Sequence, residues 1–296
     1  MVAIVLALVS ALGYGISDFY GALATRRLGA ISATLASYSS GVLVLGLGVL
    51  IVPGAWSVET VTFGALAGVL VGAGFLSFYA AIARGPVAIL APMIAVVYAT
   101  VPVCWVIARG EQLPALAWAG VALGVLAVLL LSVPAPGGAE SDEERAAEDA
   151  AGQRRGPSIA ALLMGLGAAL GMGGASVALD YVPHDSGLTS ALVETIVAVV
   201  LLSLVFAFVP RPGRGEVDSR ALWIALGSGV LLAVGNGLFV LALQHGSLAL
   251  VGVLVSLYPL ATILLARFVL REHISRVQWL GIGLAIVAAV LMGLAK

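Results

Sequence analysis

The sequence predicts an all-α integral membrane protein whose ten transmembrane helices form two inverted five-helix repeats. Three observations support this prediction: a strongly apolar composition, ten segments long enough to cross a bilayer, and one long stretch that occurs twice. Hydrophobic residues make up 61% of the 296 residues and charged residues only 10%, whereas soluble domains are about a quarter charged. The mean hydropathy of +1.15 therefore excludes an ordinary soluble fold, and the net charge of −1 gives no indication of a nucleic-acid partner.

The repeated stretch organises the chain. Residues 81–130 align without a gap with residues 242–291, which lie 161 positions later. The informative matches involve residue types that are rare here, Glu111 with Glu272 and Trp118 with Trp279, while Gly85 also falls on Gly246 and Gly120 on Gly281. Such self-similarity indicates a duplicated structural unit.

Five segments of the first half can cross a bilayer, which requires about 20 mostly apolar residues. They are Val2–Ala24, Ile31–Val52, Val61–Ala83, Val87–Ala108 and Pro114–Val133. The breaks between them carry arginine, glycine and proline, and the last two are typical of turns. We interpret residues 1–133 as the first repeat.

The composition changes sharply after this repeat. Residues 134–157 contain a Pro-Gly-Gly turn, six acidic residues and three arginines, which is typical of a solvated linker. The second repeat, residues 158–296, contains five more predicted spans: Ser158–Leu179, Leu188–Val209, Arg220–Leu243, Leu248–Leu270 and Arg276–Ala295. Because five is odd, the second repeat crosses the bilayer in the opposite sense, as in transporters that work by alternating access.

The distribution of arginine predicts the orientation. The loops that follow the odd-numbered spans hold nearly all basic residues: Arg26, Arg27, Arg84, Arg145, Arg154, Arg155, Arg211, Arg214, Arg220, Arg271 and Arg276. The other side holds only Arg109 and Lys296. The positive-inside rule therefore predicts a multi-pass plasma-membrane protein with these loops and the acidic linker in the cytoplasm and both termini outside.

The second half carries residues that indicate a family. Tyr258-Pro259 lies inside the ninth span, and Arg271-Glu272, Trp279 and Gly281 lead into the last span. In these motifs the chain resembles the EamA family of the drug/metabolite transporter superfamily. The first half departs from the pattern, because Tyr98 is followed by Pro102 rather than by an adjacent proline. The resemblance implies two EamA-like repeats and a secondary carrier, often an exporter, of small metabolites, amino acids or drugs.

Asp18 is the first candidate for the transport site. An ionisable group inside a span is costly unless it is paired or faces water, so it indicates function by default. Tyr14 lies one helical turn before Asp18 on the same predicted face. The alternative is that Asp18 lies near the interface and extends towards Arg26.

Glu194 is the second candidate, six residues into the seventh span. Its structural alternative is an interfacial carboxylate near Asp185 and His184. Span one ends on one side of the membrane and span seven begins on the other. We therefore expect Asp18 and Glu194 to lie towards opposite faces and not to touch. Two separate gates, or one functional and one structural acid, follow from that expectation.

The other candidates are polar or aromatic residues within spans. Asn236, between two glycines, either lines the cavity or joins helices by a hydrogen bond. Tyr79, Tyr98 and Tyr258 are either cavity-lining residues or interfacial anchors. Glu111 repeats as Glu272, and both precede helices, where a carboxylate favours the positive N-terminal end.

The predicted function is export of a small, mostly neutral or amphipathic solute, coupled to proton entry through Asp18 or Glu194. The chain contains no metalloprotease, nucleophile-elbow or phosphate-loop motif, so we expect no enzyme activity, catalytic residue, metal or cofactor. The expected partners are a small-molecule substrate, the lipid bilayer and protons, with no nucleic acid; the sequence leaves a homo-oligomer open. The alternative function is a non-transporting membrane scaffold or a lipid scramblase.

Overall fold

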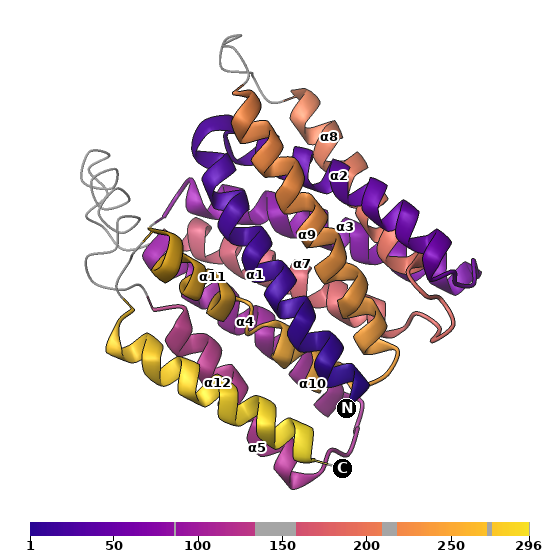
Figure 1. Ribbon diagram of the computed structural model, residues 1–296, viewed down its shortest axis with the longest axis vertical. Helices are drawn as coiled ribbons and strands as arrows, with labels where there is room; N and C mark the ends of the chain where they lie inside the picture. Colours follow the sequence, from indigo (N-terminus) through magenta and orange to yellow (C-terminus); the bar gives the residue numbers. More distant parts are fainter. Residues whose placement is uncertain (86, 134–157, 209–217, 271–273, 296) are drawn as a thin grey trace.

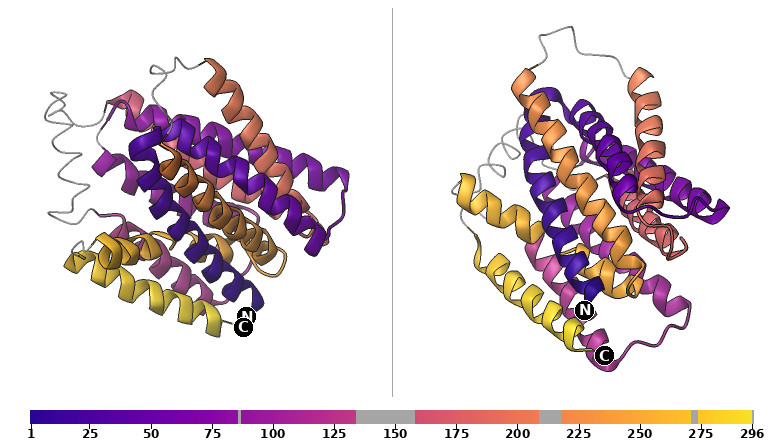
Figure 2. Two further views of the ribbon diagram at one scale, coloured as in Figure 1. Left: turned by 45° about the horizontal axis from the view of Figure 1, so that its top comes forward. Right: turned by 45° about the vertical axis from the view of Figure 1, so that its right-hand side comes forward.

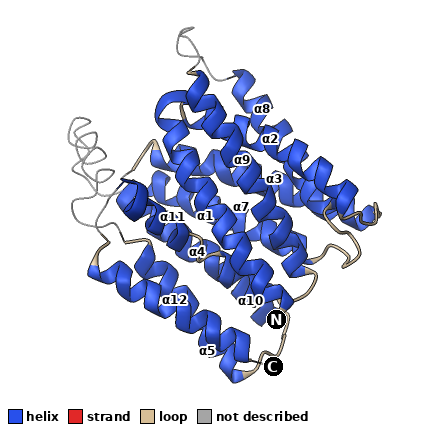
Figure 3. Cartoon of the chain, in the orientation of Figure 1, coloured by secondary structure: helices blue, strands red, loops and turns tan. Residues whose placement is uncertain are grey.

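The chain is helical throughout its described part. The computed structural model describes residues 1–85, 87–133, 158–208, 218–270 and 274–295, and no strand occurs among them (Figure 3). Within these residues, eight helices are long and apolar enough to cross a membrane. The shorter apolar helices Met93–Ala108 and Ala115–Leu131 occupy the two remaining predicted spans. The predicted linker, residues 134–157, and the Arg271-Glu272 pair lie outside the described residues.

The helices follow the predicted spans closely (Figure 1). The first half contains α1 (Val2–Leu28), α2 (Ala30–Ile51), α3 (Val58–Ile82), α4 (Val87–Ala108) and α5 (Ala115–Leu131). The second half contains α7 (Ile159–Asp180), α8 (Thr189–Phe208), α9 (Ser219–Leu243), α10 (Leu248–Val255), α11 (Pro259–Leu265), the π-helix η1 (Ala266–Leu270) and α12 (Arg276–Leu294). Span one therefore ends at Leu28 rather than at the predicted Ala24, and span nine is divided into three pieces.

Polar side chains fix where several of these apolar helices begin. Ser57, Ser158 and Ser275 each accept a backbone hydrogen bond in the first turn of α3, α7 and α12, respectively, which satisfies donors that the helix itself leaves free. Asp218 does the same for α9 and also pairs with Arg27 at 2.8 Å. The hydrogen bond from Arg27 lowers the pKa of Asp218 below its ordinary value, as an opposite charge does for any carboxyl group.

Proline accounts for the division of span nine. Pro259 is the first residue of α11, and because proline lacks an N–H, it cannot continue the hydrogen-bond ladder from α10. Ser256, Leu257 and Tyr258 therefore form a turn between the two helices. Pro102, by contrast, lies within α4, which is continuous from Val87 to Ala108.

The helices pair across the two halves of the chain. α1 lies along α9 and α3 along α7, while α5 pairs with α12 at one edge (Figures 1 and 2). Glycines allow the first two pairs to approach closely: a Cβ atom on Gly13 would lie 3.1 Å from Cα of Gly235, and one on Gly171 would lie 3.0 Å from Cα of Gly74. Small residues at such crossings are typical of membrane helix packing.

The packing differs between the two ends of the bundle. α1 begins and α12 ends at the same end, which we call the terminal side (Figure 1). The largest buried cluster lies mainly near this side, with Ala3 from the start of α1, Leu179 from the end of α7, Leu243 from the end of α9, and most of α10.

Two smaller buried clusters lie towards the opposite side. One contains Ala81, Leu90 and Ala161 from α3, α4 and α7, and the other joins α1, α2 and α9. These two clusters have no helix in common. Among the described residues, the buried apolar core is therefore continuous at the terminal side and divided into two clusters at the opposite side, where the Thr34–Tyr79 hydrogen bond still joins α2 to α3.

Candidate functional site

A chain of hydrogen bonds joins three helices inside the bundle. Tyr14 of α1 donates its hydroxyl hydrogen to Asn236 Oδ1 of α9 at 3.0 Å, and Asn236 Nδ2 donates to Glu194 Oε2 of α8 at 2.9 Å. The absence of a side chain at Gly235 allows α1 to come this close, since a Cβ atom there would lie 3.2 Å from the backbone nitrogen of Tyr14. Asn236 thus links Tyr14 to Glu194, although 180 residues separate these two in the sequence.

Glu194 is not interfacial. Its side chain is only 6% exposed, and Thr189 and Ser190 at the start of α8 are fully buried. Gln244 at the end of α9 holds the preceding loop by donating to Ser186 Oγ and to the Gly187 carbonyl, both at 2.9 Å. Because this loop is covered by the protein, α8 begins below the surface and its sixth residue lies deep within it.

Asp18 also lies far from the end of its helix. α1 continues ten residues beyond Asp18 to Leu28, a distance of roughly 15 Å along the helix axis. The carboxylate is exposed and makes no hydrogen bond or ion pair with any described residue. The alternative interpretation, in which Asp18 reaches Arg26, therefore has no contact to support it.

Several tyrosines lie near the two carboxylates. Asp18 is close enough to interact electrostatically with all five tyrosines of this group, and Glu194 with three of them; the five are Tyr14, Tyr38, Tyr79, Tyr98 and Tyr258. The hydroxyl of Tyr79 is hydrogen-bonded to Thr34, and the Tyr38 ring packs edge-on against Phe75 with centroids 5.6 Å apart. We call these five tyrosines, together with Asp18, Glu194 and Asn236, the tyrosine–carboxylate cluster.

The structure brings all seven predicted site residues into this one cluster. Asp18 and Glu194 share Tyr14, Tyr38 and Tyr98 as electrostatic neighbours, although the two acids make no contact with each other among the described residues, and the expectation of two separate gates stays a prediction. The interfacial alternative for Glu194 is not supported, because the first residues of span seven are buried. Whether these residues act in transport remains a prediction.

Tyr38 was missed by the sequence reasoning. It is the ninth residue of α2 and therefore lies well inside a span, as Tyr98 does in α4. The same criterion of depth within a span would have found it. Among the described residues, no arginine or lysine is an electrostatic neighbour of the cluster, and no group of side chains suited to a metal ion is present.

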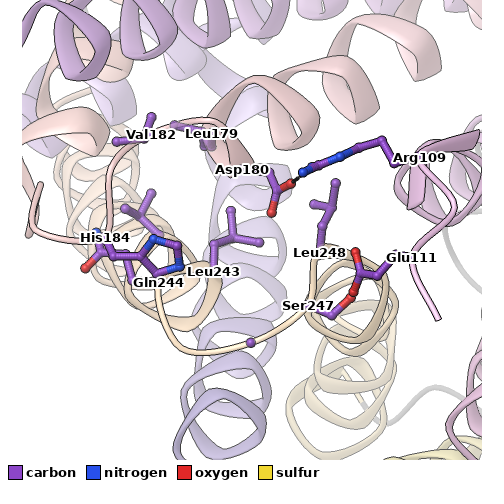
Figure 4. A pocket seen from close by; sticks show the side chains of 12 residues that line it. Arg109, Glu111, Leu179, Asp180, Val182, His184, Leu243, Gln244, Ser247 and Leu248 are labelled. Carbon is purple, nitrogen blue, oxygen red and sulfur yellow. Dashed lines mark hydrogen bonds and ion pairs between the residues drawn. The ribbon is translucent and has the colours of Figure 1, made fainter. Parts of the chain in front are cut away.

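A separate pocket of about 240 Å³ lies at the terminal side, where α4, α7 and α9 end and α10 begins (Figure 4). At its wall, Arg109 Nη1 lies 2.8 Å from Asp180 Oδ2, and the guanidinium lies 5.3 Å from the centre of the Tyr181 ring. Glu111 lines the same pocket and does not cap the next helix, since α5 begins after Pro114 without a side-chain cap. We call the Arg109–Asp180 pair the terminal-side latch, because it joins the end of α4 to the end of α7.

Comparison with known proteins identifies part of the chain. Residues 159–294 match the model of the EamA-like transporter family. A solved structure described as "Crystal structure of protein" is similar with a TM-score of 0.67 and 18% sequence identity, and the similarity covers 97% of each chain. At this identity the similarity concerns the fold alone. No curated protein matches the chain.

Proposed function

Through its second half, this chain belongs to the EamA-like transporter family, and we propose that it is a secondary transporter that exports small metabolites, amino acids or drugs. The observation that carries the proposal is the tyrosine–carboxylate cluster. Two acids, an amide and five phenol groups converge from α1, α2, α3, α4, α8, α9 and the break in span nine. Such a concentration of polar groups within membrane spans is costly and is typical of a solute or ion pathway. A transporter of this kind is not an enzyme.

The contacts between helices support an inverted repeat. The α1–α9 crossing uses Gly13 and Gly235, and the α7–α3 crossing uses Gly171 and Gly74. Gly74 lies 161 positions before Gly235, the same offset as in the repeated stretch, and Gly13 aligns with Gly171. Each close contact therefore has a counterpart made by the equivalent residues of the other half, as expected when two inverted units meet around a pseudo-two-fold axis.

The uneven packing of the bundle supports alternating access. The terminal side is held by one large buried cluster and by the latch, whereas the buried apolar residues of the opposite side form two smaller clusters that the Thr34–Tyr79 hydrogen bond joins. We assign this conformation to a state in which the cluster is reached from the arginine-rich side. By the positive-inside rule, that side is cytoplasmic in a plasma-membrane protein, which is the side from which an exporter takes up its solute.

Coupling to protons is proposed through Asp18 and Glu194. A carboxylate inside a span can carry a proton across if it is exposed to each side in turn. Asp18 is exposed in the present conformation, while Glu194 is buried and hydrogen-bonded to Asn236. The two acids therefore differ in their exposure to solvent at this stage of the cycle. Protons that enter the site would neutralise both carboxylates.

Removing the latch is expected to increase access from the terminal side. The latch is partly exposed, with side-chain exposures of 45% for Arg109 and 16% for Asp180, and such pairs contribute about 0.2–1 kcal/mol. Arg109→Gln should therefore shift the population towards the open terminal side by up to about fivefold. The measurement uses Leu254→Cys in a Cys104→Ser background, because Leu254 is fully buried. The introduced thiol should react with a hydrophilic maleimide up to about fivefold faster when Arg109→Gln is also present.

The matched control is Arg84→Gln, because Arg84 bonds only to a backbone carbonyl of its own helix among the described residues. An equal labelling rate in the Arg84 and Arg109 variants would show that the latch does not hold the terminal side closed.

The function itself is tested with purified protein in liposomes that contain a pH-sensitive dye. Amino acids, amines and aromatic drugs are added with and without a proton gradient. We expect proton movement that depends on one solute class and is lost in Asp18→Asn, while the variant of the exposed residue Glu59, Glu59→Gln, behaves as the unchanged protein. Movement of labelled lipid without solute transport would instead identify a scramblase, and solute flux that Asp18→Asn leaves unchanged would remove Asp18 from the coupling.

A further inference from the structure

We infer that the tyrosine–carboxylate cluster binds an organic cation, namely an amine or quaternary ammonium compound with an aromatic or compact alkyl body. The inference rests on the proposed transport function and narrows its substrate class. It follows from the position of Glu194, which is buried and shares three tyrosine neighbours with Asp18. With the acids together, a neutral solute no longer fits the site best.

The charges of the site favour a cation. Asp18 and Glu194 are both acidic, and among the described residues the cluster has no arginine or lysine as an electrostatic neighbour. Glu194 Oε2 accepts a hydrogen bond from Asn236, whereas Oε1 accepts none from any described residue. Glu194 as a whole is only 6% exposed. Oε1 is not one of the fully buried atoms without a partner, so it keeps accessible surface at which a ligand ammonium group would pair with it.

The aromatic groups point to the same ligand class. Five tyrosines, from α1, α2, α3, α4 and the break in span nine, are electrostatic neighbours of Asp18, so aromatic groups from several helices lie near this acid. Tyrosine faces attract ammonium groups within about 6 Å of the ring centre, and aromatic cages are a common way to bind quaternary ammonium ligands. Phe75 stacks on Tyr79 with centroids 6.3 Å apart and adds apolar surface for the body of the ligand.

The same arrangement disfavours amino acids and organic anions. The carboxylate of such a solute would need a cationic or strongly donating partner inside the protein. The donors in the cluster are phenol hydroxyls and the amide of Asn236, and Asn236 and Tyr79 already have partners in Glu194 and Thr34. A solute carboxylate would also lie close to Asp18 or Glu194, where like charges repel. Within the classes proposed for transport, amines are therefore favoured over amino acids.

Binding of three probes to the purified protein in nanodiscs tests this inference. The probes are phenyltrimethylammonium, its neutral carbon isostere tert-butylbenzene, and benzoate, with empty nanodiscs to subtract partitioning into lipid. We expect the cation to bind at least roughly thirtyfold more tightly than the neutral isostere, and benzoate not to bind. Glu194→Gln should weaken cation binding at least roughly tenfold, because it removes one member of a buried charge pair.

A ring variant separates a specific contact from a general loss of structure. Tyr38→Phe keeps the aromatic face and should change the dissociation constant by less than about twofold, while Tyr38→Leu removes the face and should weaken binding roughly two- to thirtyfold. Equal binding of the cation and tert-butylbenzene, stronger binding of benzoate, or no binding of any probe would overturn the inference. Specific cation binding without solute flux in liposomes would contradict the transport proposal instead, so the two failures are distinguishable.

Discussion

Glu194→Gln is expected to reduce solute-dependent proton movement to the level of protein-free liposomes. Glutamine has the shape of glutamate, and its side-chain oxygen can still accept the 2.9 Å hydrogen bond from Asn236 Nδ2. The link from α8 to α9 and on to Tyr14 therefore remains, and the protein should stay folded. What is lost is the group that can take up and release a proton, which is the proposed basis of coupling.

The measurement is the rate of dye response in proteoliposomes when solute is added under a proton gradient. Glu59→Gln is the matched control, because Glu59 is exposed in the first turn of α3 and carries the same chemical change away from the cluster. Both variants should elute as a single species, and the two should be equally stable. If Glu194→Gln retained solute-dependent proton movement, Glu194 would be a structural carboxylate and the coupling would have to depend on Asp18 alone.

Gly15→Ala is expected to disrupt the site from the opposite wall. A Cβ atom at Gly15 would lie 2.3 Å from the Tyr258 carbonyl oxygen and 2.6 Å from Ala261 Cβ, so α1 would have to move away from the break in span nine. The hydrogen bond from Thr262 Oγ1 to the Gly15 carbonyl, 3.0 Å long, would be strained or lost. Overpacking of this kind lowers the free energy of unfolding by about 1–3 kcal/mol.

The displacement should also reduce transport, because Tyr14 and Asp18 flank Gly15 on α1 and would move with it. A shift of about 1 Å in a positioned group can reduce a rate roughly a hundredfold, and we expect at least a tenfold loss of solute flux. Gly21→Ala is the control on the same helix, since its Cβ atom would meet Ser228 Oγ at 3.6 Å, an ordinary contact. Equal melting temperatures and fluxes for the two variants would show that α1 does not depend on this close approach.

Individual residues show how far the sequence could predict the site. Tyr14, Asp18, Tyr98 and Tyr258 were identified because polar and aromatic residues within apolar spans are rare and costly, which is a local property. Glu194 was identified for the same reason, but the sequence did not show that it is buried, because its depth depends on a loop that Gln244 holds against the protein. The role expected for Glu111 at a helix start was also not found, since the helix begins four residues later and Glu111 faces the pocket.

The sequence by itself determined the helical membrane fold, the positions of the ten spans and the duplicated stretch, because each follows from the length and hydrophobicity of a continuous segment. Only the tertiary structure decided which polar residues meet. The link from Tyr14 through Asn236 to Glu194 depends on the close approach of α1 and α9 at Gly13 and Gly235. The depth and rotation of helices relative to one another are set by such contacts between distant segments, and no local pattern records them.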